Sequence, residues 1–205
     1  MSRFLWRFFF ILTFAALTAG SVVLWLSPDP FYHAQEFLAL GRYQSFDASI
    51  RAAAARHGVD PLLVKAVVWC ESRFHPDKVG GAGERGLMQI TEPAASDWAK
   101  AEKMETFVPT DLFDAKTNLD AGVWYLAKAL ERWKAKDDPV PFALAEYNAG
   151  RTRVDRWLAA TNMGEQATAD DFLAAIDFPG TRRYIADIMG RHRYYRTRAE
   201  QRDVE

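Results

Sequence analysis

The hydrophobic and polar positions divide the chain into an apolar N-terminal run and a longer part with helical patterning. The run from Phe8 to Leu26 contains no charged residue. At about 1.5 Å per residue, a helix of this length comes close to the ~30 Å hydrocarbon core of a membrane. Between residues 47 and 198, no segment alternates apolar and polar residues for long enough to predict a substantial sheet. We therefore expect an N-terminal helix followed by a mainly α-helical domain.

Helix-start and helix-face signals recur within residues 47–198. Asp60 before Pro61 is typical of an N-cap followed by the first helical residue, and Thr91 offers a second N-cap. An amphipathic helix is predicted by the spacing of Leu119, Val123, Leu126, Leu130 and Trp133. Further helices are predicted around residues 141–150, 154–158 and 184–195. The glycine-rich stretch at 75–86 predicts an irregular loop between two helices.

These patterns predict four segments. Residues 1–27 form a signal anchor or transmembrane helix, 28–46 a linker, 47–198 one domain and 199–205 a polar tail. Arg3 and Arg7 lie on the N-terminal side of the apolar run, so the positive-inside tendency places the domain outside the cytoplasm. The small residues "AGS" at 19–21 offer a possible cleavage site, which keeps open the alternative of a removable signal peptide.

Composition narrows the classes of function. A hydrophobic fraction of 49% and an aromatic fraction of 14% indicate a folded core, and a net charge of −1 gives no reason to expect a nucleic-acid partner. The single cysteine, Cys70, excludes an internal disulfide, and no Cys/His grouping has the spacing of a zinc site. We therefore expect no metal and no cofactor.

One acidic residue interrupts an apolar helix face. Leu63, Val67, Glu71 and Phe74 are spaced so that they share one face, and Glu71 lies near the C-terminal end of that helix. Low polarity and the negative end of the helix dipole both disfavour the carboxylate, which raises the pKa of the acid. A protonated acid near neutral pH is what cleavage of an acetal requires. The alternative is a glutamate that turns out to solvent at the helix end.

Three further motifs follow Glu71 in order. They are "GLMQ" at 86–89, "NLDAGVWYL" at 118–126 and "AEYNAG" at 145–150. With the pair formed by Glu71 and Ser72, they resemble the catalytic domain of the soluble lytic transglycosylase family, a relative of goose-type lysozyme. The resemblance spans roughly residues 47–195. It implies a lysozyme-like fold that cleaves the β-1,4 bond between N-acetylmuramic acid and N-acetylglucosamine and leaves 1,6-anhydro ends.

The same resemblance implies roles for individual residues and a location. Glu71 matches the family's single catalytic glutamate, which acts first as acid and then as base. The implied substrate-binding residues are Ser72, Met88, Gln89, Tyr147 and Asn148. Ser72 could instead cap its helix, and Met88 and Tyr147 could instead be core residues. The implied partner is the glycan strand of peptidoglycan, which places the domain in the periplasm of a bacterial envelope, anchored to the inner membrane or secreted after signal cleavage.

The chain departs from the family pattern at three places. Gly80 stands where many members have a serine, Glu84 and Arg85 replace small residues before "GLMQ", and Gly180 replaces a glutamate that usually precedes Thr-Arg. Two alternatives remain open. A hydrolytic muramidase would need a water-positioning carboxylate, for which Glu84 is the candidate in the loop, and a catalytically silent peptidoglycan-binding scaffold would need neither acid.

Two other features have simpler interpretations. Cys70 lies beside the acid without an evident histidine base, so we interpret it as a small buried residue and not a nucleophile. Six arginines against one acid lie between residues 180 and 198. A solvated helix face is the default interpretation of this charge, and contact with anionic envelope polymers or lipid head groups is the alternative.

Overall fold

The computed structural model describes residues 3–26, 30–39 and 41–202, which form two compact units, Met1–Tyr43 and Gln44–Glu205. The first unit contains α1 (Arg3–Leu26) and α2 (Pro30–Leu38), and α3 (Arg42–Ser45) spans the boundary between the units. In the described part of the chain, no helix is long and apolar enough to cross a membrane. The membrane anchor, and the boundaries at 27, 46 and 198, stay predictions from the sequence.

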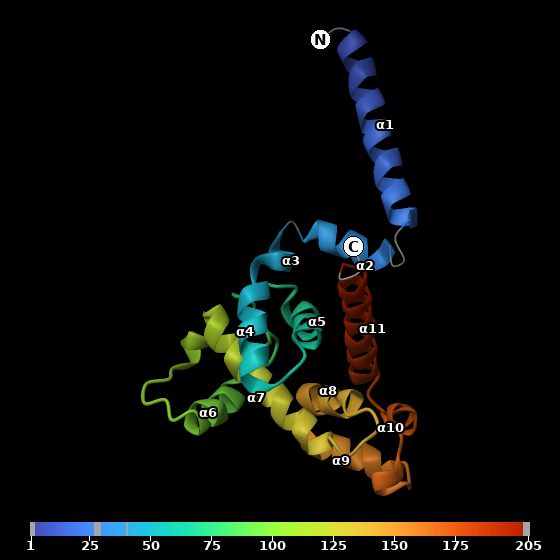
Figure 1. The fold of residues 1–205 in the computed structure, drawn as a ribbon. Coiled ribbons are helices and arrows are strands. Elements are labelled where there is room, and N and C mark those ends of the chain that lie inside the picture. The colour runs from blue at the N-terminus through green and yellow to red at the C-terminus, as the bar shows by residue number, and fades with distance from the viewer. Residues whose placement is uncertain (1–2, 27–29, 40, 203–205) are drawn as a thin grey trace. The chain divides into compact units, whose positions relative to one another are not determined.

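The second unit is built from helices (Figure 1). In chain order they are α4 (Asp47–His57), α5 (Pro61–Ser72), α6 (Glu92–Ala101), η1 (Pro109–Phe113), α7 (Ala115–Trp133), α8 (Val140–Ala149), α9 (Arg151–Ala160), η2 (Gly164–Gln166), α10 (Ala169–Ala175) and α11 (Pro179–Arg202). Within the described residues, extended pairing is limited to two isolated antiparallel bridges, Val79 with Arg85 and Arg85 with Ile90. The prediction of a mainly α-helical domain is confirmed.

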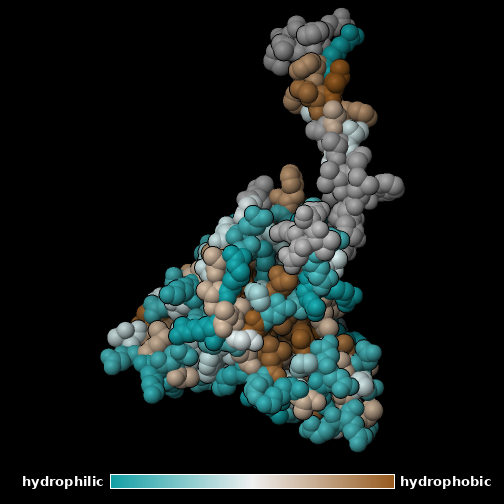
Figure 2. All heavy atoms as spheres, viewed as in Figure 1, coloured by the Kyte–Doolittle hydropathy of each residue, from teal (hydrophilic) through white to brown (hydrophobic). Residues whose placement is uncertain are grey.

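The core of the second unit forms where the longer helices meet. Helix α5 packs against α4 and α11, and α8 packs against α7, α9 and α11; Figure 1 shows α11 beside α5. Fully buried large side chains come from every part of this arrangement and include Ile50, Phe74, Leu126, Phe142 and Trp157. On the face seen in Figure 2, mostly hydrophilic residues cover the outside of this unit. Segments that are distant in sequence are therefore brought to one core, which fixes α5 against α11.

Helix α5 begins and ends as its local sequence dictates. Asp60 Oδ1 accepts a 2.8 Å hydrogen bond from the Leu62 N–H, and Pro61 occupies the first turn, which confirms the predicted N-cap. The helix ends at Ser72 and is followed by Arg73 and Phe74, whose φ angles of 53° and 61° are both left-handed. Two consecutive residues in this sparsely populated region reverse the chain immediately after the helix.

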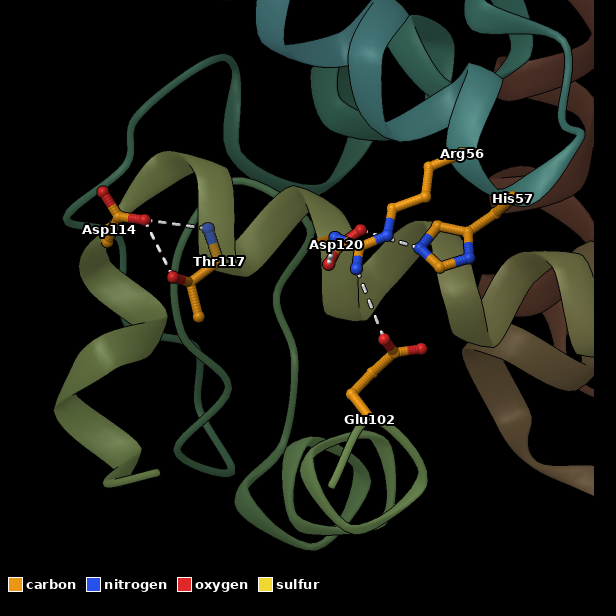
Figure 3. Close-up of polar contacts among 6 residues, drawn as sticks. All are labelled: Arg56, His57, Glu102, Asp114, Thr117 and Asp120. Atoms are coloured by element: carbon orange, nitrogen blue, oxygen red, sulfur yellow. Dashed lines mark hydrogen bonds and ion pairs between the residues drawn. The ribbon is translucent and has the colours of Figure 1, made fainter. Parts of the chain in front are cut away.

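Polar contacts fix α7 in place (Figure 3). Arg56 Nη1 and His57 Nε2, at the end of α4, lie 2.8 Å and 2.7 Å from the two carboxylate oxygens of Asp120 on α7. Arg56 also reaches Glu102, which follows α6, at 3.4 Å. The Asp114 carboxylate caps α7 by accepting 2.8 Å hydrogen bonds from the N–H and hydroxyl of Thr117. These contacts hold α4, α6 and α7 together around a side chain, Asp120, that is largely buried.

The basic C-terminal segment only partly matches its default interpretation. Arg182, Arg183, Arg193 and Arg196 are exposed on α11, as expected of a solvated helix face. Arg191 is an exception, because it is only 2% exposed and its guanidinium lies 4.1 Å from the centre of the Trp69 ring. A cation over an aromatic face is an arrangement that stabilises buried arginine. Arg191 therefore helps to join α11 to α5.

Candidate active site

Glu71 lies in the last turn of α5, where it is half-buried next to α11. Tyr184 Oη donates a 2.7 Å hydrogen bond to Glu71 Oε1. Burial raises the pKa of Glu71 to about 7, and the negative charge of Glu84 contributes in the same direction. The hydrogen bond from Tyr184 and the positive charge of Lys78 act against this rise. Glu71 is therefore an acid that gains and loses its proton near neutral pH, as its place in the apolar stripe predicted.

Two tyrosines lie close to this acid. Burial and the charge of Glu71 raise the pKa of both Tyr147 and Tyr184 well above the usual value, so both remain neutral hydrogen-bond donors. Tyr147 Oη, on α8, donates a 2.9 Å bond to the carbonyl oxygen of Met88. Tyr184 was not among the site residues expected from the sequence, because its spacing with Ile188 and Tyr195 predicted only a helix. The available signal was the "FPGTRRY" segment at 178–184, which ends at Tyr184.

The loop after α5 folds back onto the end of that helix. Lys78 Nζ donates to the backbone carbonyl oxygen of Glu71. The Gln89 amide nitrogen donates to the carbonyl oxygens of Lys78 and Gly86, at 3.1 Å and 2.9 Å. These bonds hold Gln89 in a left-handed conformation with φ of 50°. The "GLMQ" motif is thereby tied to the helix that carries the acid.

Asn118 joins two of the sequence motifs physically. Its amide oxygen accepts a 2.8 Å bond from the Met88 N–H, and its amide nitrogen donates to the carbonyls of Arg85 and Leu112 at 2.8 Å and 2.9 Å. Gly86, with φ of 78°, lies so close that an added Cβ would be 2.2 Å from Asn118 Nδ2 and 2.4 Å from the Leu112 oxygen. Only glycine fits there, because both the conformation and the space exclude a side chain.

The remaining expected site residues differ in what they offer to a substrate. The Ser72 hydroxyl donates to the Val68 carbonyl at 3.1 Å, back along its own helix, and the residue is buried. Met88 is fully buried, with its side chain against Gly122. Asn148 is exposed, and its Oδ1 accepts a 2.8 Å bond from the buried Thr181 on α11. The substrate-binding roles of these residues stay predictions.

A pocket adjoins the loop on the side of α6 and α7. Its volume is about 370 Å³, and its lining includes Gln89 and Tyr147 together with Asp97, Tyr125, Glu146 and Arg151. Tyr125 Oη donates to Asp97 Oδ2 at 3.2 Å. Gln89 and Tyr147 therefore border a space whose lining also offers several hydrogen-bonding side chains.

Cys70 precedes the acid on α5. Burial, followed by the charge of Glu71, raises the pKa of the thiol to about 11. The group is therefore a neutral thiol at physiological pH, which is the poorly nucleophilic form. In the part of the chain that the structure describes, no group of three or more His, Cys, Asp or Glu residues is placed to hold a metal ion.

Comparison with known proteins identifies the family. The family model of the transglycosylase SLT domain matches residues 48–169. The chain belongs to this family. Its relatives include membrane-bound lytic murein transglycosylase F of Desulfosudis oleivorans, 39% identical over 137 residues that cover 65% of this chain and 28% of the relative. The soluble lytic murein transglycosylase of Escherichia coli K12 is 31% identical over 132 residues, 64% of this chain and 20% of the relative.

Solved structures share the fold of this SLT domain. An inactive mutant of lytic transglycosylase Slt from Pseudomonas aeruginosa superposes with a TM-score of 0.67 and 22% identity, over 77% of this chain and 25% of that one. The 70-kDa soluble lytic transglycosylase of Escherichia coli gives 0.64 and 25%, over 75% and 24%. The chain thus spans about a quarter of the length of these proteins.

The SLT match contains the acid but not all of its surroundings. Glu71, Gln89, Asn118 and Tyr147 lie inside the matched range of 48–169. Tyr184, which donates the hydrogen bond to Glu71, lies beyond it on α11. The site is therefore completed by a helix outside the matched region.

Proposed function

We propose that this SLT domain is a peptidoglycan lytic transglycosylase that uses Glu71 as its single catalytic acid and base. The observation that carries the proposal is a half-buried carboxyl group whose pKa is raised to about 7 and whose Oε1 is held by Tyr184. Membership of the family supports the reaction class. The full names of its relatives, lytic murein transglycosylases, support peptidoglycan as the substrate.

In the first step, protonated Glu71 donates its proton to the glycosidic oxygen. The bond between that oxygen and the anomeric carbon of N-acetylmuramic acid breaks, and N-acetylglucosamine leaves with a new hydroxyl group. Positive charge develops at the anomeric carbon, where the sugar's own acetamido oxygen can assist, so no protein nucleophile is required. Because Tyr184 engages Oε1, the other carboxyl oxygen is the one assigned to carry the transferred proton.

In the second step, the same group acts as the base. The 6-hydroxyl of the muramic residue attacks the anomeric carbon and gives its proton to the Glu71 carboxylate, forming the 1,6-anhydro ring. Glu71 is then protonated again and no water is consumed. A pKa near 7 suits both steps, because the group must be a competent acid in one and a competent base in the other.

Substrate binding is assigned to the groups around this acid. Gln89 and Tyr147 border the pocket beside the loop and would contact the glycan strand with Asn148. Met88 and Ser72 are buried, so their contribution would be to support the loop and the helix end rather than to contact the sugar through their side chains.

Product analysis of digested sacculi tests the activity. Wild-type protein should release muropeptides that are one water lighter than the hydrolysed forms, as identified by mass spectrometry. Glu71→Gln should release none, and the matched substitution of the exposed Glu105→Gln should digest like wild type. Reducing ends without anhydro ends would instead favour a hydrolytic muramidase. Binding without any cleavage would favour a scaffold.

We also propose that the apolar segment at residues 1–27 anchors the domain at the periplasmic face of the inner membrane. The support for this location is the charge-free run after Arg3 and Arg7. Alkaline carbonate extraction of membranes should leave the full chain in the pellet. N-terminal sequencing should begin at the original start, and a mature protein that starts near residue 20 in the soluble fraction would contradict the anchor.

A further inference from the structure

A second carboxylate occupies a space that exists only because residue 80 is glycine. A Cβ placed on Gly80 would be 2.3 Å from Glu84 Oε2 and 2.8 Å from Gln89 Oε1. Both distances are too short for real contacts, so the two side-chain oxygens fill the volume that a side chain at position 80 would need. Glu84 is held there by its own loop, because Oε2 accepts a 2.9 Å bond from the Ala82 N–H.

The backbone fixes this loop as a closed unit. The Gly80 N–H donates to the Glu84 carbonyl oxygen at 2.8 Å, and the Gly86 N–H donates to the Lys78 carbonyl oxygen at 2.9 Å. Lys78 in turn reaches the carbonyl oxygen of Glu71. The loop that packs against the end of α5 therefore also places the half-buried Glu84 carboxylate. The Glu84 side chain points into the space that the missing side chain of Gly80 leaves free.

The titratable groups that act on Glu71 come from α5, α8, α11 and the loop after α5. Tyr184 from α11 and Tyr147 from α8 are neutral, and Cys70 on α5 is a neutral thiol. The loop supplies the two charged groups, Lys78 and Glu84, which act on Glu71 with opposite sign. Glu84 is the group in this set whose negative charge favours the protonated acid.

We propose that Glu84 is a positioning residue of the candidate site: its carboxylate, held in the space beside Gly80 by the loop that packs against the end of α5, assists Glu71 in its role as acid and base. This inference rests on the proposed function of Glu71 as acid and base. Like charges disfavour simultaneous ionisation, so Glu84 makes Glu71 a stronger base once its proton has left. The second step, in which the muramic hydroxyl loses a proton, gains from that increased basicity.

The pH dependence of kcat/KM tests the proposal, with Glu84→Gln as the principal variant. Glutamine keeps an oxygen that can accept the Ala82 N–H but removes the charge. Activity should fall as pH rises through the pKa of Glu71, and Glu84→Gln should move this alkaline limb to lower pH by a fraction of a unit. The shift should be larger at low ionic strength, because salt screens charges that are partly exposed. A purely structural role for Glu84 would lower the rate without moving the limb.

Gly80→Ala offers an independent route to the same change. The added methyl group would displace the end of the flexible Glu84 side chain, which lies closest to it, at little cost to folding. The alkaline limb should again move to lower pH. In the double variant with Glu84→Gln, the second substitution should add no further shift, because there is no charge left to displace. Glu105→Gln, an exposed carboxylate outside the site, should leave the limb in place.

The outcomes separate this inference from the proposed function. Wild-type protein that releases no anhydro products at any pH contradicts the function itself. Wild-type protein that is active, with an alkaline limb that Glu84→Gln leaves unmoved, overturns only the role of Glu84. A Gly80→Ala shift that persists at full size in the double variant would also overturn it, because the shift would then have a different cause.

Discussion

Tyr184 Oη donates a 2.7 Å hydrogen bond to Oε1 of Glu71, a residue 113 positions earlier in the chain. This bond stabilises the ionised carboxylate, whereas burial stabilises the protonated acid. The two effects set the pKa of about 7 between the ordinary value and that of an unpaired buried acid. Helix α11 thus adjusts the chemistry of a group on α5.

Tyr184→Phe should move the alkaline limb of the pH–rate profile to higher pH. The variant loses the donor that favours the carboxylate, so the pKa of Glu71 rises, opposite to the effect expected for Glu84→Gln. The plateau rate should fall roughly tenfold, since the carboxyl group loses its orientation. Tyr194→Phe on the same helix removes a hydroxyl that accepts a bond from Arg198 and should leave the limb unchanged. A limb that moves to lower pH in Tyr184→Phe would contradict this account.

Glu71→Gln should stabilise the folded protein at alkaline pH. The pKa of Glu71 is raised in the folded state, from 4.5 to about 7. The folded state therefore binds this proton more tightly than the unfolded state does. The stabilisation that results is fully present below pH 4.5 and is lost as pH rises to about 7. The loss is on the order of 3 kcal/mol.

Urea unfolding of wild type and Glu71→Gln at a series of pH values checks this linkage. Between pH 4.5 and pH 7, the unfolding free energy of the variant should rise relative to that of wild type. Above this range the difference between the two should stay constant. The exposed Glu105→Gln substitution should give a gap that does not vary with pH in this way. A gap that shrinks as pH rises would contradict the raised pKa.

Asn118→Ala should destabilise the domain by about 3 kcal/mol. The substitution removes three hydrogen bonds from a fully buried amide and takes the partner from the Met88 N–H and the Leu112 carbonyl, while the Arg85 carbonyl keeps its bond from the Ile90 N–H. Denaturant unfolding should show a lower midpoint, and catalytic rate should fall because the loop loses its attachment to α7. Lys116→Ala, an exposed position on the same helix, should have little effect on the midpoint. Equal midpoints for the two variants would contradict the proposed attachment.

Gly86→Ala should cost at least about 2 kcal/mol of folding free energy. The new methyl group would meet the backbone oxygen of Leu112 at 2.4 Å in a left-handed conformation, and a backbone atom cannot move aside easily. Gly81→Ala in the same loop is the matched control, because nothing lies within 4 Å of its added Cβ. Thermal unfolding of the two variants should therefore give clearly different midpoints. A tolerated Gly86→Ala would mean that the loop can move away from α7.

The sequence predicted the local structure well where the determinants are local. Asp60 and Thr91 cap their helices as expected, with Thr91 accepting from the Ala94 N–H. In the amphipathic stripe, Leu119, Val123 and Leu126 are fully buried, although Leu130 is only half-buried. Caps and helix faces depend on residues a few positions apart, so a single sequence carries their full signal.

The candidate site was predicted only in part. The interruption of an apolar stripe identified Glu71 as an acid with a raised pKa, because burial follows from the pattern of its own helix. The sequence could not decide whether Ser72 and Met88 face a substrate or the interior, and the structure buries both. That outcome depends on α7, where Gly122 makes room for the Met88 side chain.

The sequence by itself therefore determined the helical class, the caps and the acid on α5. Only the tertiary structure decided what surrounds that acid. Tyr184 and Lys78 contact Glu71 from separate elements, and Tyr147 on α8 holds the loop at residues 75–90 through the Met88 carbonyl oxygen. The tertiary structure also decided where the Glu84 side chain points, since that depends on the space left by Gly80. A helix pattern specifies which face is buried, but the partners that it meets there are chosen by the packing of the whole domain.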